Sequence, residues 1–284
     1  MNLMKTTVLL AALTGLLVLV GDLIGGPSGA VLFLVLAGAM NFFAYWYSDK
    51  MALKMAGAHE VTESQEPGLF AIVRNVARLS GMPMPRVYVI ETDSHNAFAT
   101  GRNPEHAVVA VTSGIRRILN DRELTGVLGH EMGHVKNRDI LTSSIVATVA
   151  GAISMIAQML MFSEMFGGGF GGRGRNNQNP LLLLVAMLVA PIAASLIQLG
   201  ISRQREYAAD RTGAEVTHDP EALASALEKL ERGVQMRPMQ ATPVQQSVSA
   251  LYIVKPFSSE GGMHNLFSTH PPLEERIRRL RSME

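Results

Sequence analysis

Residues 121–139 have the sequence DRELTGVLGHEMGHVKNRD, which predicts the helix at the centre of the fold. Asp121 is a good N-cap with a glutamate in the first turn, so the helix is expected to begin near Asp121 and to run through His130. Apolar residues precede the pentapeptide HEMGH, and charged residues follow it. His130 and His134 are then one turn apart and project from the same face of the helix, where both can bind one metal ion.

Zinc is the metal that such a histidine pair favours. Imidazole nitrogens bind zinc well, and a catalytic zinc site has three protein ligands and one open position for water. Bound zinc lowers the pKa of that water to about 7. Glu131, beside the histidines, is placed to take the proton and not to bind the metal. Because the chain has no cysteine, the remaining ligand must be a histidine, an aspartate or a glutamate.

Residues 205–210, with the sequence REYAAD, offer two carboxylates at positions i and i+4. We expect Glu206 to be the third ligand, and Asp210 to accept a hydrogen bond from a ligand histidine. A solvated charged turn of helix is the alternative for this segment taken alone. The surrounding sequence favours the ligand, because an apolar stretch begins just after His134 and another ends just before Glu206. Two antiparallel spans would return both segments to the same membrane face.

Four apolar stretches pass or nearly pass the length of about 20 residues that a membrane-spanning helix needs. Charged residues make up only 17% of the chain, against roughly 25% in soluble domains. Turn-forming glycine, proline and serine separate the first two stretches and predict a helical hairpin. A polar, glycine-rich loop separates the last two. The predicted spans are residues 6–24, 29–47, 140–162 and 180–201.

The distribution of lysine and arginine predicts the orientation of these spans, because such residues favour the cytoplasmic side. One side of the membrane holds only two of them close to the spans, Arg173 and Arg175. The other side holds Lys5, Lys50, Lys54, Lys136, Arg138, Arg203 and Arg205. Both termini are therefore expected in the cytoplasm, together with the polar segments 48–139 and 202–284. Each segment is small for a domain, so the two are expected to share one core.

The expected fold class is mainly α with a small antiparallel β-sheet, joined to four transmembrane helices. Helical spacing of apolar residues predicts a helix over residues 67–79. In the second polar segment, Asp219 caps a helix that begins at Pro220, and Pro271 begins a terminal helix. Short strands are predicted at residues 86–90, 96–100 and 107–111. The second and third of these strands are expected to form a hairpin.

The segments HEMGH, REYAAD, NAFATGR and STHPP resemble the signature segments of the HtpX family, membrane zinc metallopeptidases of bacterial protein quality control. The likeness extends over nearly the whole chain and includes the arrangement of four spans. It implies one zinc ion per subunit, held by His130, His134 and Glu206. It also implies that Glu131 is the catalytic base.

Two further roles come from this resemblance. Asn96, Ala97, Phe98 and Ala99 would belong to an edge strand that lines the cleft and pairs with an extended substrate backbone. His270 resembles a histidine that approaches the substrate and steadies the developing oxyanion. A position at the entry to the last helix is the alternative explanation for His270.

The resemblance implies a zinc endopeptidase that cleaves misfolded or damaged membrane proteins under stress, at the cytoplasmic face of the bacterial inner membrane. Its partners would be protein or peptide substrates and the lipid bilayer; the net charge of +1 gives no reason to expect nucleic acid. An intramembrane metalloprotease is one alternative, but charges such as Arg122 and Lys136 argue against burial of HEMGH in the bilayer. A zinc-stabilised scaffold is another, but it would not require Glu131.

Overall fold

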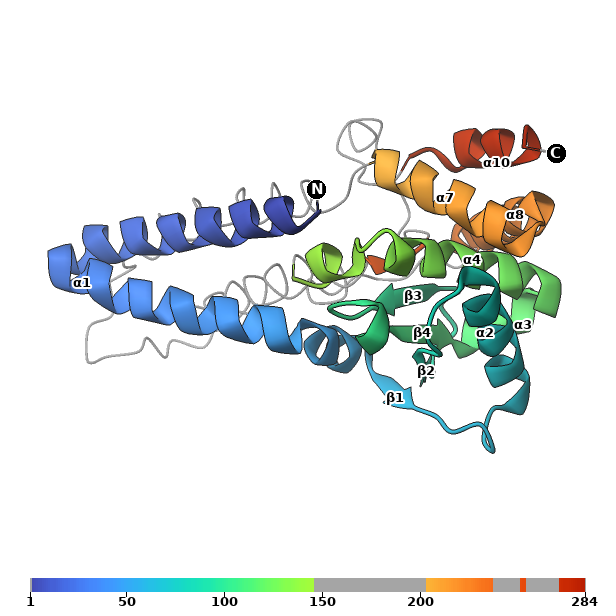
Figure 1. Ribbon diagram of the computed structural model, residues 1–284, viewed down its shortest axis with the longest axis horizontal. Helices are drawn as coiled ribbons and strands as arrows, with labels where there is room; N and C mark the ends of the chain where they lie inside the picture. The colour runs from blue at the N-terminus through green and yellow to red at the C-terminus, as the bar shows by residue number, and fades with distance from the viewer. Residues whose placement is uncertain (1, 146–202, 237–250, 254–270, 284) are drawn as a thin grey trace.

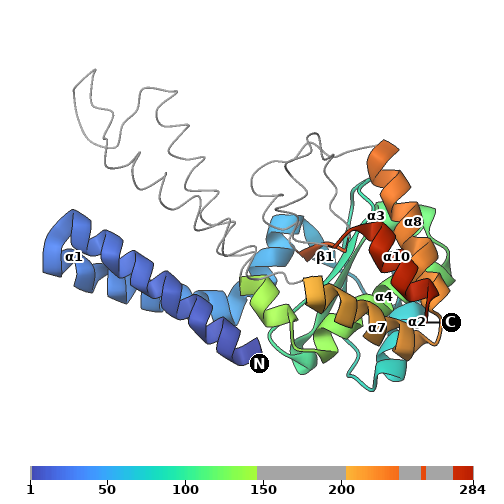
Figure 2. The same cartoon turned by 90° about the horizontal axis from the view of Figure 1, so that it is seen from above.

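The computed structural model describes residues 2–145, 203–236, 251–253 and 271–283. In these ranges, helices pack around a small sheet, and helix α1 (Asn2–Ala56) extends away from them as two arms (Figures 1 and 2). His270, most of the predicted span 140–162 and the whole predicted span 180–201 lie outside the described residues.

The two arms of α1 are antiparallel and meet at Gly25 and Gly26, whose backbone is not helical. Between the arms, Asn41 donates a hydrogen bond of 2.8 Å from Nδ2 to Thr14 Oγ1. The turn therefore lies where the sequence predicts it, but the second arm continues to Ala56. Among the described residues, one helix, Gly25–Ala56, is long and apolar enough to cross a membrane.

The sheet is mixed, with strand order β1-β2-β4-β3. β2 and β4 pair in parallel, whereas β1–β2 and β3–β4 are antiparallel. The expectation of an antiparallel sheet was therefore wrong for the central pair. The reason is that β3 forms the predicted hairpin with β4 at the outer edge, and β4 is left to lie beside β2. The strands are β1 (Ala58–Glu60), β2 (Arg86–Ile90), β3 (Ala97–Thr100) and β4 (Val108–Thr112).

Helices of the described ranges pack on the sheet and on one another, and several begin where the sequence predicts. Helix α2 begins at Pro67, and Asp219 caps α8 by accepting a hydrogen bond from the backbone N–H of Ala222. The N-cap of α4 is Asn120 and not Asp121, because Asn120 and Glu123 form a reciprocal capping box. The helices are α2 (Pro67–Ser80), α3 (Ser113–Ile118), α4 (Asp121–Lys136), α7 (Arg203–Thr217), α8 (Pro220–Met236) and α10 (Leu273–Arg281).

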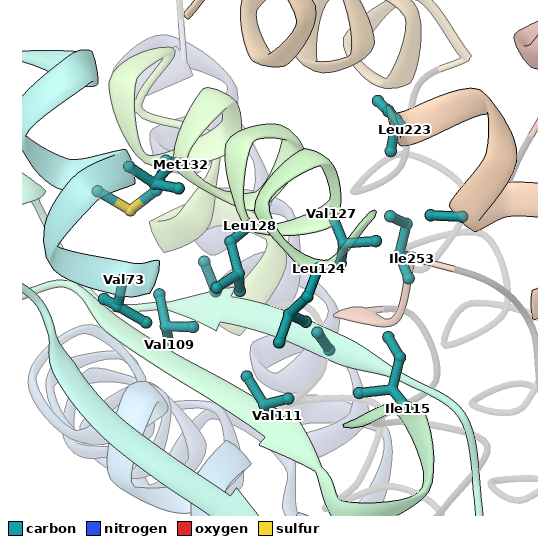
Figure 3. Packing of buried hydrophobic residues seen from close by; sticks show 14 of the residues in the cluster. Val73, Val109, Val111, Ile115, Leu124, Val127, Leu128, Met132, Leu223 and Ile253 are labelled. Atoms are coloured by element: carbon teal, nitrogen blue, oxygen red, sulfur yellow. The ribbon is translucent and has the colours of Figure 1, made fainter. Parts of the chain in front are cut away.

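Strand β4 is buried on both faces, so that hydrophobic clusters lie on either side of the sheet. Val109 and Val111 belong to the larger cluster, which includes residues of α2, α4, α8 and α10 (Figure 3). Val108 and Ala110 belong to the smaller cluster, which includes Leu53 near the end of α1. Residues before and after the apolar segment 140–201 thus contribute to one core.

Helices α4 and α7 approach closely because small residues face each other along the contact. A Cβ atom added to Gly133 would lie 2.9 Å from Ala209 O, and one added to Gly213 would lie 2.7 Å from His130 N. Such separations are too short for a side chain without movement of a helix. The two glycines therefore allow α7 to carry its carboxylates against the histidines of α4.

Gly213→Ala is expected to separate the two helices and to weaken binding of the metal that the sequence predicts by at least about tenfold, since residues that support a metal site contribute roughly 10–100-fold to its affinity. Metal affinity measured by chelator competition checks this expectation. Gly68→Ala is the matched control, because a Cβ atom at Gly68 meets nothing within 4 Å. Wild-type affinity in Gly213→Ala would show that α7 tolerates the shift without moving its carboxylates.

Candidate metal centre

Three potential metal ligands meet where α4 and α7 cross. His130, His134 and Glu206 each offer one ligand atom, and these atoms lie within 4.8 Å of one another. His134 Nε2 is 3.4 Å from Glu206 Oε1, and His130 Nε2 is 3.8 Å from Glu206 Oε2. Tetrahedral zinc with bonds of 2.0–2.1 Å separates its ligand atoms by about 3.3 Å. The three residues predicted as ligands therefore have a spacing that fits zinc with small adjustments.

The His130 ring is prepared to bind a cation. The residue is only 1% exposed, and burial lowers the pKa of His130, which favours the neutral imidazole that a metal requires. Its Nε2 atom is buried and has no hydrogen-bond partner within the described parts of the chain. Since buried polar atoms are nearly always paired, this nitrogen fits a metal ligand.

The opposite nitrogen of each ring faces a second carboxylate. His130 Nδ1 is 2.9 Å from Asp210 Oδ1, and His134 Nδ1 is 3.4 Å from Asp139 Oδ2. A carboxylate accepts a hydrogen bond from Nδ1–H, so each Nε2 keeps its lone pair directed toward Glu206. Asp210 lies where the sequence analysis expects it. Asp139 was not among the predicted residues.

Asp139 reaches His134 because of the way in which α4 ends. Arg138 has a φ of 58°, and the N–H of Asp139 donates to His134 O at 2.9 Å, while the N–H of Arg138 donates to Val135 O at 3.0 Å. These two bonds form a Schellman motif, which turns the chain back over the last turn of the helix. Glycine usually occupies the left-handed position, and its absence here hid the motif in the sequence.

Arg276 of α10 is the second functional candidate that the sequence analysis missed. The residue is 1% exposed, and its guanidinium donates two hydrogen bonds to Asp210, of 2.8 and 2.7 Å. A third bond, of 3.1 Å, goes to the carbonyl of Ile253. Burial would raise the pKa of Asp210, but Arg276 and His130 hold it at about 2. Arg276 thus keeps the carboxylate that orients His130 ionised.

A signal for Arg276 was present in the sequence. Leu273, Arg276, Ile277 and Leu280 are spaced as i, i+3, i+4 and i+7, so the arginine stands within the apolar stripe of α10. A charged residue in such a stripe indicates a buried partner.

Glu131 connects the metal centre to the edge strand. Its side chain is buried, and Oε2 accepts a hydrogen bond of 2.8 Å from the N–H of Ala99 in β3. Burial raises the pKa of Glu131 to about 8, although His134 and the Ala99 N–H act in the opposite direction. A carboxyl group with a pKa near neutral pH can both accept and release a proton during catalysis.

The predicted substrate-binding residues lie at the edge of the sheet. Ala97 to Ala99 belong to β3, and Asn96 precedes it, with its Oδ1 accepting a hydrogen bond of 3.2 Å from the N–H of Ala97. Ala99 lines a cavity together with Glu131 and the three candidate ligands. Phe98 is directed to the smaller hydrophobic cluster, where its ring centroid is 5.7 Å from that of Tyr252.

Comparison with known proteins connects this geometry to a family. The sequence profile described as Peptidase family M48 matches residues 63–284. A protein named Protease HtpX homolog from Methylibium petroleiphilum is 52% identical over 284 residues, which cover 99% of this chain and 98% of that protein. A protein of the same name from Burkholderia multivorans is 51% identical, with 99% and 97% covered.

A solved structure shares the fold. The crystal structure of Ste24p from S. mikatae matches with a TM-score of 0.50 at 17% identity, and the match covers 98% of this chain. It covers 65% of the Ste24p chain, so this chain spans about two thirds of that protein's length. At this identity the match concerns the fold alone. The profile match and the full-length relatives decide the family: the chain belongs to the HtpX metallopeptidases of peptidase family M48.

Proposed function

We propose that this metallopeptidase holds one zinc ion through His130, His134 and Glu206 and cleaves misfolded or damaged membrane proteins at the cytoplasmic face of the inner membrane. The observation that carries the proposal is that both Nε2 atoms face the Glu206 carboxylate, at 3.4 and 3.8 Å, while a separate carboxylate faces each Nδ1. When bound, zinc would supply Lewis acidity for activating water and polarising the scissile carbonyl.

The residues around the metal centre have distinct roles in proton transfer, substrate binding and orientation of the ligands. Glu131 takes a proton from the attacking water and delivers it to the leaving amine. The edge strand β3 positions an extended substrate backbone beside Glu131 by strand addition. Asp210 and Asp139 keep the histidine rings in the tautomer that binds metal. The family resemblance assigns to His270 the role of steadying the developing oxyanion.

The apolar surface of α1 supports the membrane location. Large apolar side chains on the arm Gly25–Ala56 are exposed, among them Val31, Leu32, Val35 and Phe43. Water would solvate such a surface poorly, whereas lipid acyl chains would cover it. A peptidase held in this way would meet membrane proteins at the bilayer surface. The predicted cytoplasmic orientation rests on the distribution of lysine and arginine.

His134→Ala is expected to lose both zinc and cleavage of an unfolded protein such as casein, because two remaining ligands hold zinc poorly. Metal analysis of the purified chain, combined with the cleavage assay, measures both effects. His59→Ala is the control, since His59 is exposed and is not one of the three candidate ligands. Normal zinc in His134→Ala would contradict the ligand set, and unchanged zinc affinity in Glu206→Ala would place the third ligand elsewhere.

A further inference from the structure

The exposed apolar surface of α1 ends in a band of aromatic side chains. Phe42, Phe43, Trp46 and Tyr47 are all exposed. They also contact one another, with ring centroids 6.2 Å apart for Phe42–Trp46 and 5.7 Å apart for Phe43–Tyr47. Amphipathic aromatic rings, such as those of Trp46 and Tyr47, gather where the acyl chains of a bilayer meet the headgroups. The band therefore marks the depth at which α1 leaves the acyl region.

Two exposed lysines follow the aromatic band. Lys50 Nζ lies 5.3 Å from the centroid of the Tyr47 ring, and Lys54 is one turn further along the helix. A rise of 1.5 Å per residue places the Lys50 backbone about 6 Å beyond that of Trp46. The headgroup layer of one leaflet is roughly 5–8 Å thick. Lys50 is thus expected at the level of the lipid phosphates.

The connection between β3 and β4 reaches the same depth. Arg102 in this connection has its Cζ atom 4.7 Å from the centroid of the Trp46 ring. Its Nη2 lies 2.8 Å from His106 Nε2, and His106 Nδ1 lies 2.7 Å from Asn103 Oδ1. Because a guanidinium only donates hydrogen bonds, His106 accepts at Nε2 and donates from Nδ1. This chain of bonds holds the guanidinium against the aromatic band.

The cations on this side of the molecule are available to an anion. In the described ranges, no ion pair is formed by Arg102, Lys50 or Lys54. Two nearby carboxylates face another cation instead, since Arg86 lies 3.7 Å from Asp49 and 3.9 Å from Glu60. The connection itself carries one exposed carboxylate, that of Glu105. Phosphate suits this arrangement, because guanidinium and ammonium groups both bind its oxygens.

We propose that Trp46, Lys50, Lys54 and Arg102 form a headgroup surface that binds the phosphate groups of phospholipids. The inference rests on the proposed membrane location and adds that the β3–β4 connection lies within the headgroup layer. Strand β3 ends at Thr100, two residues before Arg102. A polypeptide that leaves the bilayer would then meet the substrate-binding edge without crossing bulk water.

The composition of the chain provides two probes for the depth of Trp46 and of the β3–β4 connection in the bilayer. Trp46 is the single tryptophan, and the chain has no cysteine, so one introduced cysteine can carry a nitroxide label. The full-length protein would be reconstituted in vesicles of phosphatidylethanolamine and phosphatidylglycerol. Glu105→Cys places the label on the connection, and Glu215→Cys, at an exposed site on α7, is the matched control. Brominated acyl chains report the depth of Trp46 by quenching its fluorescence.

We expect bromine near the headgroups to quench Trp46, and a water-soluble relaxation agent to reach position 105 several-fold less than position 215. Equal access at the two positions, with Trp46 quenched, would overturn the headgroup surface and leave the membrane location intact. An unquenched Trp46 would overturn the membrane location and the headgroup surface together. Arg102→Gln should reduce cleavage of a membrane-anchored substrate about fivefold, the effect of one cation at a membrane surface, without changing cleavage of casein.

Arg74→Gln is the control for this variant, because Arg74 is an exposed arginine of α2 that forms an ion pair with Glu63. An equal loss with both substrates would mean that Arg102 supports the fold and would overturn its role in lipid binding. Unchanged cleavage of the membrane-anchored substrate would overturn that role as well.

Discussion

Glu131→Gln is expected to lower kcat for an unfolded protein substrate by roughly 10²–10⁴-fold, the usual contribution of a general base, while the protein keeps its zinc. The amide has nearly the shape of the carboxyl group, and its oxygen can still accept the hydrogen bond that Ala99 N–H donates at 2.8 Å. The amide cannot take a proton from water. Cleavage of casein by the detergent-purified protein, with metal content determined on the same sample, measures both quantities.

Glu215→Gln serves as the control for this substitution, since Glu215 is exposed on α7. Equal activity of wild type and Glu131→Gln would mean that another group is the base or that a contaminating peptidase cleaves the substrate. Loss of zinc together with activity would instead show that Glu131 supports the metal centre and would leave the base unassigned.

Arg276→Met is expected to lower the free energy of unfolding by about 3–5 kcal/mol, because the removal of one partner from a buried ion pair leaves the other charge uncompensated. That charge is the Asp210 carboxylate, which receives two hydrogen bonds from Arg276. The pKa of Asp210 should rise. A protonated Asp210 would accept the hydrogen bond from His130 less well, so the contact between these two residues should weaken. A lower unfolding temperature and weaker zinc binding are the measured consequences.

Arg281→Met tests the same chemical change on the same helix, but Arg281 is half-exposed and its partners are Glu221 and Glu228. We expect little change in unfolding temperature for this control. Combining Arg276→Met with Asp210→Asn should recover part of the stability, since the uncompensated charge is then absent. A wild-type unfolding temperature in Arg276→Met alone would show that water or another cation replaces the guanidinium.

Local signals in the sequence predicted several of the helices and strands. Helical spacing of apolar residues predicted a helix that begins at Pro67, where α2 begins, and the strand predicted over residues 86–90 is β2 with its observed ends. The order of the strands could not be predicted in this way. Strand pairing depends on which strand takes the edge, and here a short connection kept β3 beside β4 while β4 paired with β2. The short strand β1 and helix α3 were also missed.

The residues of the candidate site show the same difference between local signals, which the sequence reveals, and tertiary contacts, which it does not. Spacing within one helix pointed to His130 and His134, and a pair of carboxylates at positions i and i+4 pointed to Glu206 and Asp210. Asp139 required knowledge of a left-handed residue at the end of α4. Contacts that depend on tertiary packing were not visible, and Arg276, separated from Asp210 by 66 positions along the chain, is the clearest example.

The two carboxylates behind the histidine rings also affect the thermodynamics of metal uptake. Asp210 and Asp139 restrict the rotation of both imidazoles through contacts of 2.9 and 3.4 Å within the protein itself. The loss of side-chain entropy that ligand rings usually suffer on coordination therefore occurs during folding of the polypeptide. A cation that enters this centre meets preorganised donors, so a larger part of the intrinsic bond energy remains as binding affinity.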